Sequence, residues 1–85
     1  MLLGIYTKMR KCHEIIIEKK PDDPTAKENY GLNLRKIGLY QKACEQYLEA
    51  VSLYNERFNE AEAKRIYENL NTISVEQKDQ AILFE

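Results

Sequence analysis

The chain has 85 residues, 44% of them hydrophobic and 32% charged, which predicts one small globular domain rather than a disordered segment. Thirteen basic and fourteen acidic residues give a net charge of −1, which argues against direct binding to nucleic acid or to an anionic membrane. No apolar run approaches the ~20 residues that span a bilayer or the ~7–15 of a signal peptide. We therefore expect an intracellular protein of the cytoplasm, in which Cys12 and Cys44 are reduced.

The first predicted helix covers residues 6–20, because apolar side chains recur there at three- and four-residue spacing on one face. The members of this face are Ile5, Met9, Cys12, Ile15 and Ile16. The Pro-Asp-Asp-Pro stretch at 21–24 ends the helix, and Asp23 followed by Pro24 is a good N-cap and first-turn pair for the next one. A capping-box pattern over 25–28 leaves open a start one or two residues later.

The second helix is predicted to end at Ile37, because Gly38 is typical of a helix C-terminus. A third helix is predicted over 40–54, and Asn59 begins a capping pattern for a fourth. The apolar positions of that fourth helix are Ala63, Ile66, Tyr67, Leu70 and Ile73. A further capping-box pattern at 74–77 predicts a fifth helix to the end of the chain, and no stretch alternates with the period of a strand. The prediction is an all-α chain of about five antiparallel helices with short connections.

Two stretches read almost alike, LGIYTK at 3–8 and IGLYQK at 37–42, and they lie 34 residues apart. In an all-helical chain this period indicates a helix–turn–helix solenoid. Gly31 falls in mid-helix, where glycine costs about 1 kcal/mol relative to alanine. This cost is understandable if another helix crosses there. Ala43 and Ala50 are small enough for close approach, and Tyr47 lies between them, one turn from each.

At these positions the sequence resembles the tetratricopeptide repeat (TPR) family. The resemblance divides a single domain, 1–85, into a half repeat at 3–23, a full repeat at 24–57 and a degenerate repeat or capping helices at 58–85. It implies right-handed superhelical stacking of helix pairs. The matching positions of the full repeat are Tyr30, Gly31, Leu34, Gly38, Tyr40, Ala43, Tyr47 and Ala50, and those of the half repeat include Gly4, Tyr6 and Pro21.

The resemblance also implies a non-enzymatic scaffold, in which the first helices of successive units line a groove that binds a peptide or a partner helix. The candidate binding residues are Asn29, Glu28, Leu32, Arg35 and Lys36. Asn29 matches a position at which some members hydrogen-bond a ligand backbone, since an amide both donates and accepts. The two basic residues suit either an acidic partner or a solvated helix end. Glu28 replaces a lysine of the clamp by which some relatives hold chaperone C-termini, which argues against that specialised function.

Nothing in the sequence predicts catalysis, a metal site or a cofactor. His13 is the only histidine and occupies an aromatic position of the half repeat, so a packed or half-exposed role is expected. The chain has no glycine-rich phosphate loop and no zinc-ligand spacing.

Two alternatives stay open at this point. Residues 63–68 resemble the signature of half-a-TPR (HAT) repeats, which occur in scaffolds of RNA-processing complexes. The first unit also lacks its first helix, which leaves an apolar face uncovered. We therefore expect either a piece of a longer protein or a homo-oligomer formed through helix 6–20 at the N-terminal end.

Overall fold

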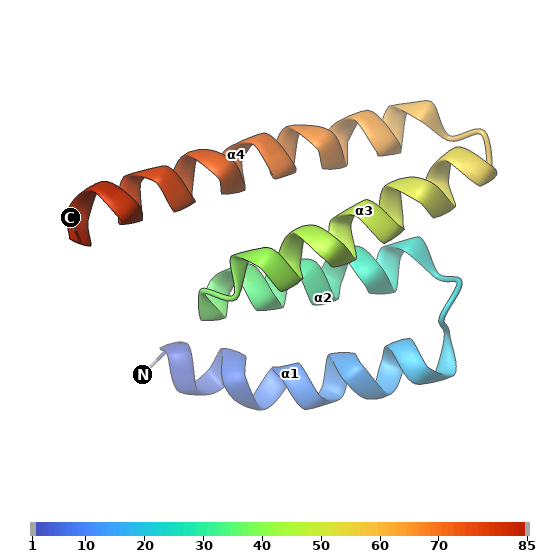
Figure 1. Cartoon of the computed structure of the whole chain (residues 1–85). Helices are drawn as coiled ribbons and strands as arrows, with labels where there is room; N and C mark the ends of the chain where they lie inside the picture. Colours follow the sequence, from blue (N-terminus) through green and yellow to red (C-terminus); the bar gives the residue numbers. More distant parts are fainter. Residues whose placement is uncertain (1, 85) are drawn as a thin grey trace.

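The structure, a computed structural model, describes the backbone of residues 2–84 and the side chains of residues 4–73. Within that range every secondary-structure element is a helix, with α1 at Leu2–Lys19, α2 at Pro24–Ile37, α3 at Tyr40–Glu56 and α4 at Glu60–Phe84. Each helix runs antiparallel to the one before it (Figure 1) and packs against it. The predicted all-α class is therefore confirmed.

The prediction of a fifth helix is wrong, because the described backbone contains four helices. The capping-box pattern at 74–77 lies inside α4, which continues from Glu60 to Phe84 without a break. Such a pattern caps a helix only where the backbone leaves helical geometry, and no glycine or proline near Ser74 forces it to do so. The side chains predicted for that fifth helix lie outside the described residues.

Both predicted ends of α2 are confirmed. The Asp23 side chain accepts hydrogen bonds from the backbone N–H groups of Thr25 and Ala26, and Pro24 occupies the first turn. At the other end Gly38 adopts a left-handed conformation with φ of 96°, which suits glycine because it has no Cβ. These two local signals fix the length of α2 to the residue.

The start of α4 likewise follows the predicted capping pattern. The Asn59 side chain accepts a hydrogen bond from the backbone N–H of Glu62, at 3.3 Å. Phe58, just before it, has a positive φ of 57° and a side chain that is 92% exposed. The large apolar side chain of this turn between α3 and α4 is therefore left in solvent.

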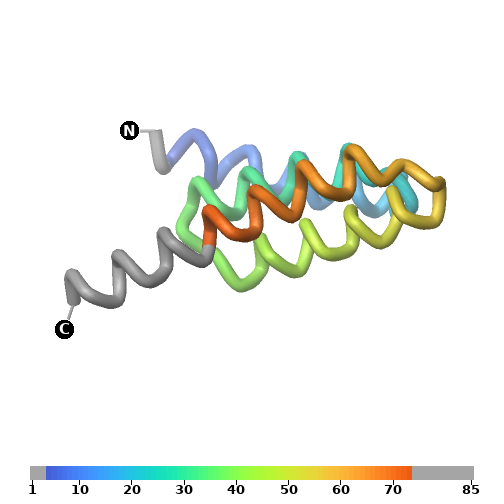
Figure 2. The backbone as a smooth tube through the Cα atoms, turned by 90° about the horizontal axis from the view of Figure 1, so that it is seen from above, coloured from blue at the N-terminus to red at the C-terminus, as the bar shows by residue number. Residues whose placement is uncertain are grey.

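The core lies between α2, α3 and α4. In the view of Figure 2, α3 lies to one side of a layer that contains α2 and the first half of α4. Among residues 4–19 of α1 no side chain is fully buried, so α1 contributes only partial contacts. The buried cluster consists of Leu34, Ala43, Tyr47, Ala50, Val51, Tyr54, Ala63, Ile66 and Ile73.

Helices α2 and α3 approach closely at Gly31, as its mid-helix position suggested. A Cβ added there would lie 3.1 Å from two ring carbons of Tyr47 and 3.3 Å from the carbonyl oxygen of Ala43. Both neighbours are fully buried, so neither can move aside easily. The missing side chain thus sets how closely α2 packs on α3.

We expect Gly31→Ala to lower the free energy of unfolding by about 1–2 kcal/mol, because overpacking outweighs the ~1 kcal/mol gain in helix propensity. Urea unfolding followed by circular dichroism measures the change. Gly4→Ala is the matched control: a Cβ there meets nothing within 4 Å, so this variant should be as stable as the native chain or slightly more stable. A Gly31→Ala variant of undiminished stability would contradict the close-approach argument.

Candidate functional site

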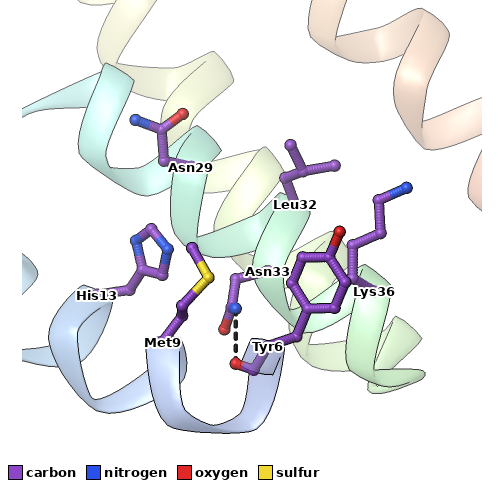
Figure 3. Close-up of a pocket in the computed structure, with 7 residues that line it drawn as sticks. All are labelled: Tyr6, Met9, His13, Asn29, Leu32, Asn33 and Lys36. Atoms are coloured by element: carbon purple, nitrogen blue, oxygen red, sulfur yellow. Dashed lines mark hydrogen bonds between the residues drawn. The ribbon is translucent and has the colours of Figure 1, made fainter. Parts of the chain in front are cut away.

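A groove of about 250 Å³ lies between α1 and α2 (Figure 3). Three of the five candidate residues, Asn29, Leu32 and Lys36, line it from α2. They recur at three- and four-residue spacing, which places them on one side of the helix. The full lining consists of Tyr6, Met9, His13, Asn29, Leu32, Asn33 and Lys36.

Asn33 is the residue of this groove that sequence reasoning missed. Its side chain is only 4% exposed, and its Nδ2 donates a hydrogen bond of 2.9 Å to the backbone oxygen of Tyr6. Its Oδ1 is buried and accepts no hydrogen bond within the described part of the chain. An unsatisfied buried polar group costs about 1–3 kcal/mol, so a donor brought by a ligand would remove a real penalty. The available signal was its place one turn after Asn29, on the same face.

Several polar contacts link α1 to α2. The Tyr30 hydroxyl donates to Glu14 at 3.2 Å, and Arg10 donates to the same carboxylate at 3.1 Å. His13 lies beside Tyr30 with ring centroids 6.3 Å apart, half-buried as its aromatic position suggested. These contacts orient α1 on α2, while no described side chain of α1 is fully buried.

The apolar stripe of the first helix borders the groove and is largely exposed. Ile5, Met9 and Ile16 are 56%, 42% and 44% exposed, and Leu32 across the groove is 44% exposed. Together with the groove these four side chains form one exposed apolar surface, which we call the α1 surface. Both predicted thiols are free, and Cys12 is exposed on this same side of α1.

The other two candidates point elsewhere. Glu28 accepts hydrogen bonds from both terminal nitrogens of Arg65 in α4, one of them at 2.8 Å, and Arg65 also pairs with Glu62. These carboxylates raise the pKa of the Arg65 guanidinium. The pair links α2 directly to α4, a contact that sequence reasoning did not predict.

Arg35 lies beside Tyr47 of α3. Burial raises the pKa of the Tyr47 hydroxyl, and the nearby charge and hydrogen bond of Arg35 lower it by a smaller amount. Of the five candidates, the structure therefore brings three together in the groove and directs two toward the packed side of the domain.

No family model, curated protein or solved structure matches the chain. Among the described residues no three His, Cys, Asp or Glu side chains are placed to hold a metal ion. In the same part of the chain no helix is long and apolar enough to cross a membrane. What the groove offers is a recess with apolar walls, an amide oxygen and an ammonium group, a combination suited to binding.

Breaking the Glu28–Arg65 pair should weaken the domain slightly. Because Arg65 is 45% exposed, we expect Glu28→Gln to lower the free energy of unfolding by under about 1 kcal/mol. The loss should shrink between 0.02 and 0.5 M NaCl, since salt screens the pair. Urea unfolding at both salt concentrations measures it, and Glu45→Gln, at an exposed position of α3, is the control. A loss that is equal at both salt concentrations would point to packing instead of charge.

Burial of Tyr47 should make stability fall at alkaline pH. Because its pKa is higher in the folded chain than in the unfolded one, the contribution is fully present below about pH 10 and is lost as pH rises through the folded value. The Tyr47→Phe variant should show a shallower loss of unfolding free energy between pH 9 and 11. Tyr67→Phe, whose ring is half-exposed, is the matched control. Parallel curves for Tyr47→Phe and the native chain would refute this interpretation.

Proposed function

We propose that this chain is a non-enzymatic protein-interaction module, built as a TPR-like stack of helices that holds a peptide or a partner helix. The observation that carries the proposal is the groove between α1 and α2. It brings Asn29, Leu32 and Lys36 next to exposed apolar side chains and to a buried amide oxygen for which residues 4–73 provide no hydrogen-bond donor. Such a mixture of apolar walls and a few polar groups is typical of binding sites.

The packing of α2 on α3 supports the TPR-like part of the proposal. The resemblance placed a glycine, an alanine and a tyrosine at the crossing of two helices, and Gly31, Ala43 and Tyr47 do meet there. The Glu28–Arg65 pair also holds α2 and α4, the first helices of two successive units in this scheme, close to each other. Stacked helix pairs with first helices side by side would present one continuous binding surface.

The RNA-scaffold alternative receives less support from its own segment. Ala63 and Ile66 are buried in the core, and Arg65 is held by two carboxylates. A guanidinium engaged in this way would have to exchange its partners to bind phosphate. We therefore keep protein, rather than RNA, as the proposed partner class, with self-association through α1 as one form of it.

Selection from a phage-displayed peptide library against the purified chain tests the proposed function. We expect enriched peptides that bind the native chain with micromolar affinity, measured by isothermal titration calorimetry. A triple variant, Asn29→Ala, Leu32→Ala and Lys36→Ala, should bind these peptides at least tenfold more weakly. The control is Leu48→Ala, which removes a half-exposed side chain of α3 outside the groove. Failure to enrich any binding peptide from repeated selections would count against an interaction module.

A further inference from the structure

Helices α1 and α3 correspond to each other in the internal repeat, and comparing them shows which side of α1 has no helix packed on it. Helix α3 is packed on two sides, by α2 and by α4, whereas α1 is packed against α2. The residues 34 positions after Met9 and Ile16 are Ala43 and Ala50, which have no exposed surface. The carbonyl of Ala43 lies against α2 at Gly31. The exposed stripe of α1 is thus the counterpart of the side of α3 that α2 covers.

Helix α2 shows the same relation. It begins at Pro24 and α4 begins at Glu60, so the two helices correspond at an offset of 36 residues. Arg65, through which α4 contacts α2, corresponds to Asn29 in the groove. The groove formed by α1 and α2 is therefore the counterpart of the site on α3 and α4 in which α2 itself lies.

We infer that this groove binds an amphipathic helix of a partner protein, whose polar edge is acidic, in the position that α2 occupies on α3 and α4. This inference rests on the proposed function and names its partner class. The apolar face of the partner helix covers Met9, Ile16 and Leu32, and a side-chain donor on it satisfies the Asn33 oxygen. Because Met9 and Ile16 are larger than the alanines of α3, the incoming helix lies farther out than α2 does and needs no glycine.

Charge around the α1 surface determines the sign of the partner. Lys8 lies three residues after Ile5, and Lys19 and Lys20 follow Ile16 by three and four, so these exposed lysines border the stripe. Lys36 lines the groove itself. The acidic Glu14 is engaged by Arg10 and Tyr30 on the side toward α2. An acidic edge on the partner complements this border.

The same charges disfavour a second copy as the occupant. Two α1 helices packed through their stripes would bring two sets of bordering lysines together, and like charges oppose association. A bilayer surface is disfavoured by shape, because the Asn33 oxygen lies in a recess between two helices that a flat surface does not enter. Both remain outcomes that the experiment can detect.

The probe is a labelled peptide of residues 22–39, the α2 sequence, carrying Gly31→Ala, Thr25→Glu and Lys27→Glu. The Thr25 hydroxyl lies 3.3 Å from the Tyr54 hydroxyl, and Lys27 pairs with Glu49 at 3.0 Å in a surface recess that Leu53 also lines. The residues 34 positions before Tyr54, Leu53 and Glu49 are Lys20, Lys19 and Ile15. On α1 the new carboxylates would therefore lie near two lysines, and an apolar residue takes the place of Glu49. A matched peptide carries Gly31→Ala alone.

Fluorescence anisotropy then gives the dissociation constant of each peptide. We expect the acidic peptide to bind the native chain at least tenfold more tightly than the matched peptide, with an affinity that falls as salt rises. The charge-reversed chain Lys19→Glu, Lys20→Glu should reverse the preference. This reversal separates ion pairing from any difference in helicity between the two peptides.

Substitutions in the chain locate the binding. Met9→Glu and Ile16→Glu lie at exposed positions, so they should not affect folding. Each should raise the dissociation constant of the acidic peptide at least tenfold. The matched control Leu48→Glu, on the exposed side of α3, should leave it unchanged. Circular dichroism checks that each variant keeps its helical content.

Equal affinity for the two peptides would overturn the inference, and so would peptide binding that Met9→Glu does not change. A light-scattering mass that shows a dimer broken by Met9→Glu would assign the α1 surface to a second copy. Binding to phosphatidylserine vesicles that Met9→Glu abolishes would assign it to a membrane. If library peptides bind the native chain and Met9→Glu does not affect their binding, the groove is not the binding site but the proposed interaction function still holds. If no peptide is enriched, both the groove and the interaction function are refuted.

Discussion

The contact between Gly31 and Tyr47 is the constraint on which the rest of the structure depends. With no side chain at Gly31, the Tyr47 ring lies directly on the α2 backbone, and the two helices share a core that continues into α4. Because this side of α2 packs on α3, the directions in which its other sides face are fixed as well. Glu28 lies toward α4, and Asn29, Asn33 and Lys36 lie toward α1. The groove is thus a consequence of how α2 is oriented, even though Gly31 does not line it.

Local signals predicted most of the helix ends, because a cap is decided by a few neighbouring residues. Asp23 and Gly38 are examples in which the chemistry of one side chain, or the lack of one, sets the boundary. The pattern at 74–77 failed for the same reason, since a capping box describes how a helix can begin and not whether the preceding one stops. Continuity of α4 needed a longer-range view than four residues provide.

Long-range contacts were beyond prediction from the sequence alone. Helical spacing placed Asn29 and Leu32 on a common face, and the groove contains both. It could not identify Arg65, 37 residues away, as the partner of Glu28, because 13 basic and 14 acidic residues allow many pairings. Nor could it show that the Asn33 oxygen is buried without a donor, since that depends on where the first turns of α1 lie.

The pattern of α1 shows which residues share a face but leaves open which face is buried. Polar contacts attach this helix to α2: an amide on a backbone oxygen, a tyrosine on a carboxylate and a tilted ring pair. Polar contacts of this kind fix register but contribute modest net stability, about 0.5–1.5 kcal/mol each. The apolar side of α1, which has the larger potential contribution, is the side left exposed. A ligand that covers it would therefore stabilise the folded chain as well as bind it, because binding to the folded state alone shifts the unfolding equilibrium by mass action. On this view α1 is positioned in advance by its polar contacts and gains most of its apolar burial from the partner.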